Sequence, residues 1–304
     1  MTIRLGIAFT PYQPPESLRT LVTTAEEAGL DELWIWEDAF KQSGLASAGP
    51  ALAWSERLRV GIGLMPAPFR NVGLTAMEVA TLGRLFPDRF VAGVGHGVQS
   101  WMAQAGVKAS SPMTLLREYL LALRRLLDGE TLTEQGRYVR LDQVRLDWPP
   151  SPRPALMAGG FGPKTLQLAA ELGDGVLLAG EWRPEQFAES IRLARQARER
   201  AGLDPATMEV VLGVSAAIGA GARDRIARTN AAAGGSSDPD LGITGDATAF
   251  AETFGQLAEM GVTAVTVAPT MGEPDLDGLL HFLGSEVRPL LSRGSGASGT
   301  GVDT

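Results

Sequence analysis

His96 combines a reactive side chain with a position that a ligand could reach. It stands between Gly95 and Gly97, directly after an apolar run over 90–94. Glycines permit close approach of a ligand to the backbone, and histidine is the side chain best suited to general acid–base chemistry near neutral pH. We predict a catalytic role for His96, the alternative being that it only shapes the turn. His281 is predicted to be structural, because it lies in an apolar helical pattern.

Two neighbouring carboxylates, Glu37 and Asp38, follow the apolar segment Leu33-Trp34-Ile35-Trp36. Carboxylates at the end of a buried strand are candidates for proton transfer. We therefore count Glu37 and Asp38 with His96 as candidate catalytic residues. A solvated pair of loop charges is the alternative for both.

A glycine-rich turn follows the short apolar run 155–158. The prolines on either side limit that run to a strand and place Pro163 at a first helical position, where its missing N–H costs nothing. Backbone N–H groups at such a helix start favour an anion. We predict phosphate binding here, against an ordinary tight turn, and expect Gly173 to end the helix as a left-handed cap. The candidate cofactor-binding residues of this turn are Ala158, Gly159, Gly160, Phe161, Gly162 and Pro163.

Composition excludes several classes of chemistry. The 304 residues contain no cysteine and two histidines, so disulfides, thiolate nucleophiles and a three-histidine metal site are ruled out. The net charge of −8 argues against a nucleic-acid surface. We find no apolar run of membrane-spanning length and no basic leader. We expect a cytoplasmic protein that acts on a small molecule, without metal, membrane or nucleic-acid partners.

Apolar runs of strand length alternate with helical patterns along the chain. About eight alternations favour a (β/α)8 barrel, with a doubly wound sheet as the alternative. We predict one domain over 1–291, with insertion segments at 131–153 and 233–246 and a disordered Gly/Ser-rich tail over 292–304. The expected strands are 3–9, 33–36, 58–65, 90–94, 155–158, 176–178, 209–218 and 264–267. The expected helices are 16–28, 50–54, 74–85, 114–127, 163–172, 184–200, 247–260 and 276–291.

The predicted helix over 114–127 has more apolar residues than one face of a helix can hold. We expect it to be deeply packed or to form part of a subunit interface, which makes a homodimer possible. In a barrel, the ligand site lies where strands end and βα loops begin. The aromatic residues and scarce charges expected there suit a large planar ligand.

Several motifs together resemble the bacterial luciferase-like superfamily over about residues 3–291. The motifs are Gly29-Leu-Asp-Glu-Leu-Trp-Ile-Trp-Glu-Asp38, Met65-Pro-Ala-Pro-Phe-Arg-Asn71, the segment 78–97, Ala158-Gly-Gly-Phe-Gly-Pro163, Gly173-Asp-Gly175 and Ile243-Thr-Gly-Asp246. The resemblance implies a (β/α)8 barrel that uses coenzyme F420 or FMN, and it is closer to the F420-dependent branch.

The resemblance also assigns roles to residues. The Ala158–Pro163 turn would hold the cofactor phosphate, and the end of strand three, at Gly63, Leu64 and Met65, would carry a non-proline cis peptide behind the ring. Asp38 and the turn of Gly95, His96 and Gly97 would border the ring.

Two departures bear on the substrate. Sugar-phosphate dehydrogenases of this branch have histidine and glutamate where this chain has Ala39 and Val98, so the resemblance argues against glucose-6-phosphate oxidation.

We therefore expect hydride transfer between bound F420 and a small organic substrate. The alternatives are an FMN-dependent monooxygenase, a flavin-binding protein without catalysis, and a phosphate-binding barrel isomerase or aldolase. The last is disfavoured because no predicted strand contains a lysine for a Schiff base. Lys164, Arg183 and Arg223 are candidate cations for the acidic tail of F420.

Overall fold

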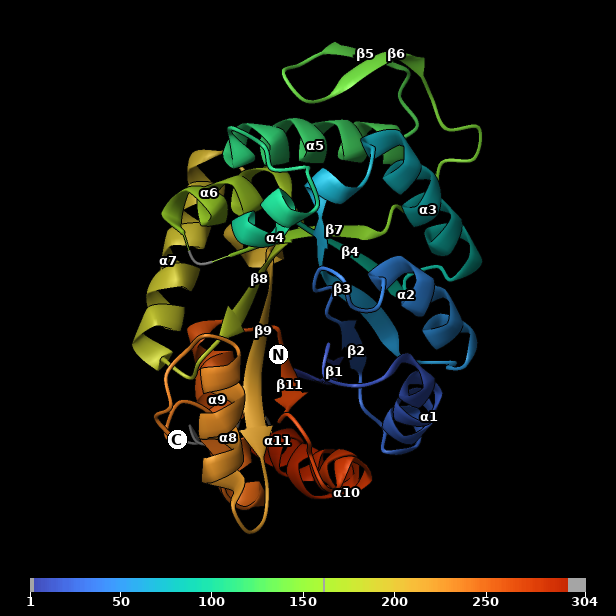
Figure 1. Cartoon of the computed structure of the whole chain (residues 1–304). Coiled ribbons are helices and arrows are strands. Elements are labelled where there is room, and N and C mark those ends of the chain that lie inside the picture. The colour runs from blue at the N-terminus through green and yellow to red at the C-terminus, as the bar shows by residue number, and fades with distance from the viewer. Residues whose placement is uncertain (1–2, 161, 295–304) are drawn as a thin grey trace, which may run out of the picture.

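The chain folds into a closed parallel barrel with helices around it (Figure 1). The structure is a computed structural model that describes residues 3–160 and 162–294. Within these residues, the strands pair in the order β1-β2-β3-β4-β7-β8-β9-β11, and β11 returns to β1 to close the ring. The predicted (β/α)8 barrel is confirmed, and the open doubly wound alternative is excluded.

The barrel strands lie within two residues of their predicted bounds. They are β1 Arg4–Phe9, β2 Glu32–Ile35, β3 Arg59–Pro66, β4 Phe90–Gly95, β7 Ala155–Gly159, β8 Gly175–Gly180, β9 Glu209–Ala217 and β11 Ala264–Pro269. The remaining strands are β5 Leu132–Gln135, β6 Arg140–Val144 and β10 Ile243–Thr244, of which β10 extends the sheet beside β9.

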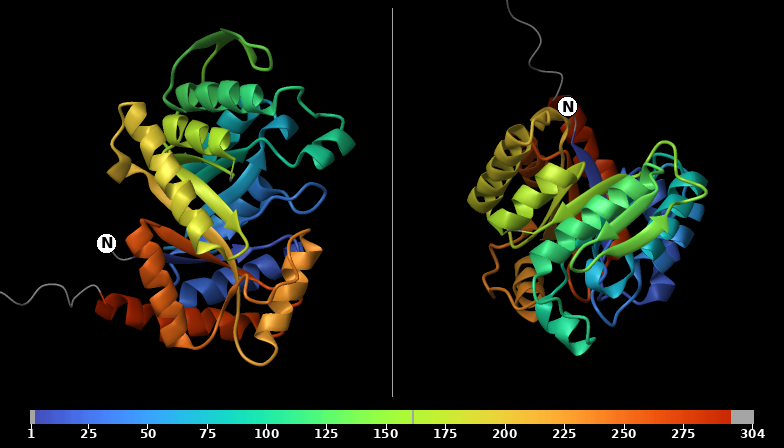
Figure 2. Two further views of the ribbon diagram at one scale, coloured as in Figure 1. Left: turned by 90° about the vertical axis from the view of Figure 1, so that its left-hand side faces the viewer. Right: turned by 90° about the horizontal axis from the view of Figure 1, so that it is seen from above.

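Helices alternate with these strands and cover the outside of the barrel (Figure 2). The α-helices are α1 Leu18–Glu27, α2 Gly44–Ala53, α3 Val72–Leu85, α4 Gln99–Gln104, α5 Pro112–Leu127, α6 Pro163–Leu172, α7 Pro184–Arg200, α8 Ala222–Ala232, α9 Ala247–Met260, α10 Leu276–His281 and α11 Arg288–Gly294. Short 3-10 helices are η1 Pro15–Ser17, η2 Ala67–Phe69 and η3 Pro205–Thr207, and a π-helical turn, η4 Phe282–Val287, joins α10 to α11.

Helix α2 begins six residues earlier than the predicted segment 50–54. Ser43 supplies the reason, because its hydroxyl accepts a hydrogen bond from the Ala46 N–H and caps the helix. Gly173 also differs from prediction: its φ is −95°, so it is not a left-handed cap. It is needed for space, since a Cβ there would lie 2.7 Å from the Ala169 carbonyl oxygen.

The two predicted insertions differ in structure: the second, over 233–246, contains the short strand β10 near its end. The first contains an antiparallel hairpin of β5 and β6, which stands out beyond α5 in Figure 1.

Helix α5 buries seven residues against the rest of the fold, which supports the deep packing expected of it, and the homodimer stays a prediction. No helix in the described ranges has the length and apolarity to cross a membrane. Helix α11 continues to Gly294, three residues into the predicted tail, and the rest of that tail lies outside the described residues.

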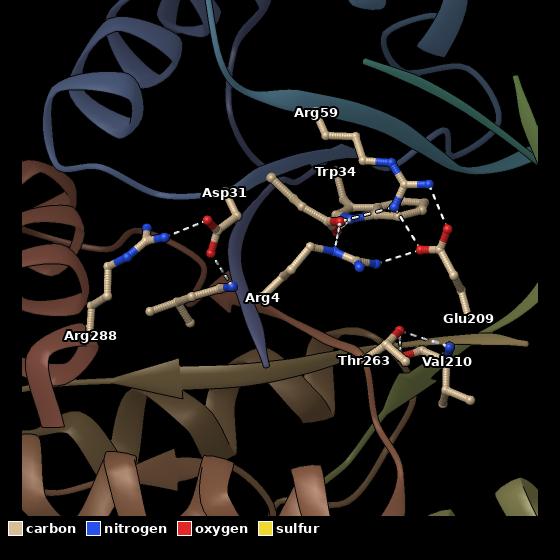
Figure 3. Close-up of polar contacts among 10 residues, drawn as sticks. Arg4, Asp31, Trp34, Arg59, Glu209, Val210, Thr263 and Arg288 are labelled. Atoms are coloured by element: carbon tan, nitrogen blue, oxygen red, sulfur yellow. Dashed lines mark hydrogen bonds and ion pairs between the residues drawn. The ribbon is translucent and has the colours of Figure 1, made fainter. Parts of the chain in front are cut away.

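Charged side chains form a network at the amino-terminal ends of four barrel strands (Figure 3). Arg59 makes two hydrogen bonds to the Glu209 carboxylate, at 2.6 and 2.8 Å, and one to Glu32 at 3.2 Å. Arg4 donates to both carboxylates. The Trp34 indole N–H donates to the buried Glu32 carboxylate at 2.7 Å. The network therefore links β1, β2, β3 and β9 across the amino-terminal end of the barrel.

We predict that Glu209→Gln lowers the free energy of unfolding by about 3 kcal/mol at pH 7, because it leaves two partly buried guanidinium groups short of a counter-charge. Burial alone would raise the pKa of Glu209, but the hydrogen bonds and charges of Arg59 and Arg4 outweigh it, so the pKa lies below its usual 4.5. This stabilisation is complete above that value and is lost as the pH falls through the lowered pKa. Urea unfolding from pH 3 to 7 measures it.

The matched control is Glu189→Gln, since Glu189 forms a similar pair with Arg192 at the surface, with both side chains about half exposed. We expect this change to cost less than about 1 kcal/mol. A Glu209→Gln penalty that is equally small, or that persists unchanged at pH 3, would contradict the proposed contribution of the network.

Candidate active site

Two adjoining cavities open at the carboxyl ends of the barrel strands. The outer cavity has a volume of about 400 Å³ and the inner one about 220 Å³. Both are lined by Trp36, Gly63, Leu64, Gly160 and Ala179, so they meet along one shared wall. We call them the outer cavity and the inner chamber. This is the end of the barrel where the sequence predicts a ligand site.

His96 lines the outer cavity, just beyond the end of β4. Its Nδ1 lies 3.0 Å from the Gly97 carbonyl oxygen. Because a carbonyl oxygen can only accept, this hydrogen bond requires a proton on Nδ1 and leaves the Nε2 of a neutral ring as an acceptor. Gln99 holds the turn by donating to the His96 and Gly97 carbonyls. Gly97 has a φ of 72°, which favours glycine.

Glu37 is held in a buried clamp rather than left free in the cavity. Its carboxylate accepts hydrogen bonds from Arg70 at 2.5 and 3.0 Å and from the Gly44 backbone N–H at 2.7 Å. The side chains of Glu37 and Arg70 are 5% and 15% exposed. The pair ties the loop after β2 to the loop after β3. Its geometry is that of a positioning element directly beside Asp38.

Asp38 lies in the outer cavity together with His96. Burial raises the pKa of the Asp38 carboxyl, an effect that the nearby Lys41 charge opposes. Burial also raises the pKa of Tyr12, and the charge of Asp38 adds to that shift, which places Tyr12 in the same electrostatic environment. The structure thus brings Asp38 and His96 to one cavity, which the clamped Glu37 also lines.

Leu64 projects between the two cavities from an irregular part of β3. The Gly63–Leu64 peptide bond is cis, as the resemblance implies, and the pairing of β3 with β4 shifts register between Ile62 and Met65. A Cβ on Gly95 would lie 2.9 Å from Leu64 Cδ1, so Gly95 leaves room for this side chain. Leu64 therefore forms a fixed apolar wall on both cavities. Met65, also predicted to bind the cofactor, is buried at 2% exposure and does not line either cavity.

The predicted phosphate turn lies at the edge of the outer cavity, where Gly159 and Gly160 line it. Gly160 has a φ of 143°, and its N–H donates to the Leu177 carbonyl. Gly162 is the N-cap of α6, with proline in its first turn, so the helix start matches prediction. Ala158 is fully buried and supports the turn from β7. Phe161 lies outside the described residues.

Sequence reasoning missed several site residues. Thr266 lines the inner chamber, where it is 3% exposed and its hydroxyl has no hydrogen-bond partner within the described structure. Arg70 was noted only as part of a loop, because its partner Glu37 lies 33 residues away. Thr266 interrupts the otherwise apolar run Ala264–Pro269 of β11, and this polar interruption is the signal that the sequence offers.

The candidate cations for an acidic tail differ in their surroundings. Arg183 pairs with Glu181 and Arg223 with Asp240. Lys164 is exposed at the start of α6, directly after the predicted phosphate turn. Among the described residues there is no group of three or more His, Asp or Glu side chains that could hold a metal ion.

The closed parallel barrel, the glycine turn at the start of α6 and the non-proline cis peptide in β3 define the class of this protein as a luciferase-like barrel. A family model confirms the class, since residues 2–263 match the luciferase-like monooxygenase family. The chain belongs to this family.

Curated relatives include reductases and dehydrogenases. The chain is 29% identical to the 5,10-methylenetetrahydromethanopterin reductase of Methanolobus tindarius over 206 residues, which cover 67% of this chain and 62% of the relative. It is 28% identical to the F420-dependent glucose-6-phosphate dehydrogenase of Nakamurella multipartita over 215 residues, covering 66% and 63%. The matches thus span less than two thirds of these relatives.

Among solved structures, the fold is similar to the coenzyme F420-dependent tetrahydromethanopterin reductase of Methanopyrus kandleri. The TM-score is 0.83 at 19% identity, and the match covers 95% of this chain and 99% of that one. At this identity the likeness shows the fold alone, and it confirms the predicted luciferase-like barrel.

We predict that Arg70→Met lowers the free energy of unfolding by about 3 kcal/mol, because it leaves the Glu37 carboxylate buried without its counter-charge. The double variant Glu37→Gln/Arg70→Met should recover part of that loss, since no charge then remains unpaired. Urea unfolding of the two single variants and the double variant measures the coupling.

Arg192→Met is the matched control, because Arg192 also makes two hydrogen bonds to one carboxylate, at 2.6 and 2.7 Å, but at the surface. Its cost should be below about 1 kcal/mol. Strictly additive penalties at positions 37 and 70 would show that the two side chains do not act as a pair.

Proposed function

We propose that this protein is an F420-dependent oxidoreductase that transfers a hydride between the deazaflavin and a small organic substrate. The observation that carries the proposal is the meeting, in one cavity, of the glycine turn at α6, the Leu64 wall and His96. The F420-dependent dehydrogenases among the relatives support the choice of cofactor.

The described residues fit a ligand with a phosphate and a flat ring. A Cβ on Gly159 would collide with the Leu177 carbonyl, and the positive φ of Gly160 disfavours any side chain there. Both positions therefore require glycine, and no side chain covers the backbone where Gly159 and Gly160 line the outer cavity, beside the start of a helix that favours an anion. Gly159, Gly160, Gly162 and Pro163 would hold the phosphate, with Phe161 retained as a predicted member. Leu64, Gly95 and Gly97 would contact the ring, with Met65 supporting Leu64 from beneath.

Bound F420 supplies or accepts the hydride, and the protein must orient the substrate and handle the accompanying proton. An alcohol that is oxidised loses a hydride from carbon and a proton from oxygen. In our proposal, His96 Nε2 accepts that proton, and returns it in the reverse direction. Asp38 is a second titratable group at the cavity, and the clamp of Glu37 and Arg70 positions Asp38.

Glucose-6-phosphate is a poor candidate for the substrate. Ala39, where the resemblance calls for histidine, is buried at 7% exposure, and Val98, in place of glutamate, is 47% exposed at the start of α4. Neither residue can transfer a proton. We therefore propose a substrate other than a sugar phosphate, despite the similarity to glucose-6-phosphate dehydrogenases.

The cofactor proposal predicts at least tenfold tighter binding of F420 than of FMN, measured by parallel spectral titration. Added salt should weaken F420 binding, because its phosphate and acidic tail are anionic. Gly160→Asp should weaken F420 binding at least tenfold more than Gly160→Asn. The two variants share the backbone strain at a φ of 143° and differ only in charge.

Equal affinities for the aspartate and asparagine variants would remove phosphate binding from this turn. Tighter binding of FMN, or oxygen consumption coupled to product formation, would favour the FMN-dependent monooxygenase instead.

The role of His96 is tested by two substitutions. We expect His96→Ala and His96→Asn both to lower turnover by about 10²-fold, the usual contribution of a general acid or base. Asparagine retains a side-chain N–H that can donate to the Gly97 carbonyl, so it preserves the turn without the acceptor nitrogen. Single-turnover hydride transfer, followed by the F420 spectrum, is the measurement. Recovery of activity in His96→Asn would show that the side chain only shapes the turn.

A further inference from the structure

Helix α4 and the residue before it form one wall of the outer cavity, to which Val98, Gln99 and Trp101 contribute. The helix has six residues, and Met102 is the one that is buried. Helices this short are not stable on their own in water, so the position of this wall depends on contacts that hold the segment 98–111 at its two ends. At the first end, Gln99 donates to two backbone carbonyls of the turn after β4.

The second end of this segment is held by Tyr138, which lies in the turn of the β5–β6 hairpin. The Ser111 N–H donates to the Tyr138 hydroxyl oxygen at 2.7 Å, and the hydroxyls of Tyr138 and Ser110 share a hydrogen bond at 2.8 Å. Arg137 donates to the same Ser110 hydroxyl at 2.6 Å, and its guanidinium carbon lies 5.3 Å from the centre of the Tyr138 ring. Two adjacent residues of the hairpin turn thus bind the two residues that directly precede α5.

The hairpin turn is itself held by Glu118 of α5. The Glu118 carboxylate accepts hydrogen bonds from three successive backbone N–H groups, at 2.8 to 3.0 Å, which belong to Arg137, Tyr138 and Val139. Burial opposes the ionisation of Glu118, but these bonds and the Arg137 charge outweigh it, so its pKa lies below the usual value. Gly136 leaves room for the carboxylate, because a Cβ there would lie 2.5 Å from Glu118 Oε2. A charged acceptor therefore fixes this turn to α5.

We propose that the β5–β6 hairpin is a strap that holds the α4 wall of the outer cavity, and that Tyr138 is a positioning residue for the ligand bound there. Glu118 fixes the hairpin turn, Tyr138 fixes the residues before α5, and the segment 98–111 is thereby held at both ends. This inference rests on the proposed function for the identity of the ligand, which is F420. It assigns a role to the insertion at 131–153.

Amide hydrogen exchange of the full-length chain, followed by mass spectrometry, tests the strap without turnover. Tyr138→Phe removes the hydroxyl and keeps the ring beneath the Arg137 guanidinium. We expect exchange within 98–110 to rise about fivefold, as for the loss of one neutral hydrogen bond, while exchange of strand β4 is unchanged. The same variant should weaken F420 binding about threefold in a spectral titration, because part of the population then has a displaced wall.

Glu118→Gln separates a strap from a local contact, because Glu118 bonds to the hairpin turn rather than to the segment 98–111. We expect it to raise exchange in the same segment. The double variant Glu118→Gln/Tyr138→Phe should show less than the product of the two single effects, since both changes release one strap. The matched control is Glu171→Gln, which removes a carboxylate paired with Arg117, the neighbour of Glu118 on α5, and should leave exchange within 98–110 unchanged. Melting temperatures confirm that each variant is folded.

The proposal is overturned if Tyr138→Phe raises exchange only within the hairpin, or if 98–110 responds and ligand affinity does not. Single effects that multiply fully in the double variant would also overturn it. FMN is titrated in parallel with F420, so that a failure of the F420 proposal leaves a ligand for the test. A wild type that binds FMN but not F420 would refute the proposed function, while exchange and FMN affinity still decide on the strap.

Discussion

The hydrogen bond from the Trp34 indole to the buried Glu32 carboxylate joins the two halves of the barrel interior. On one side, Glu32 shares Arg4 and Arg59 with Glu209, so two positive and two negative charges from four strands balance at the amino-terminal end of the barrel. On the other side, the Trp34 ring lines the inner chamber. The ring fits only because its neighbours are small: a Cβ on Gly61 would lie within 2.7 Å of three of its carbon atoms. An exact orientation of one aromatic side chain thus depends on an ion network beneath it and on glycine beside it.

A second buried ion pair lies at the carboxyl-terminal end of the barrel strands, beside the cavities. The carboxylate of Glu37 is paired with Arg70 and bonded to a backbone N–H, so it is desolvated and fully engaged. Asp38, its neighbour, forms no ion pair of this kind within the described residues, and burial raises the pKa of its carboxyl. One carboxylate of the pair is therefore engaged by a counter-charge, while burial moves the pKa of the other, Asp38, upward, toward the range in which a proton can be exchanged. The ion pair of Glu37 with Arg70 fixes the backbone that carries both Glu37 and Asp38.

The sequence was sufficient to predict the barrel, because its buried parallel strands are continuous apolar runs and its helices end at glycines. It was less informative where local signals are weak or misleading. Helix α8 has a weak apolar pattern, because two of its four buried residues, Thr229 and Asn230, are polar. It falls between a predicted strand and a predicted loop. Glu37 and Asp38 look alike in sequence. Their environments differ because Arg70, from the next βα loop, pairs with Glu37. The Thr266 hydroxyl, which is buried and has no hydrogen-bond partner among the described residues, lies on β11 between β1 and β9. No local sequence pattern predicts this pairing of distant strands.

The division between the two cavities gives the site its chemical character. The titratable groups His96 and Asp38 lie on the outer cavity, whereas aromatic and aliphatic side chains surround the inner chamber, and Leu64 separates the two. Electrostatic interactions strengthen where water is excluded, so a polarised oxygen near the Leu64 wall would feel the outer groups strongly while its apolar substituents stay dry. In the proposed hydride transfer, negative charge would develop on the substrate oxygen as the hydride arrives. Because the inner chamber has no ionisable group among the described residues, the stabilisation of that charge would fall to groups on the outer cavity and on the wall that the two cavities share.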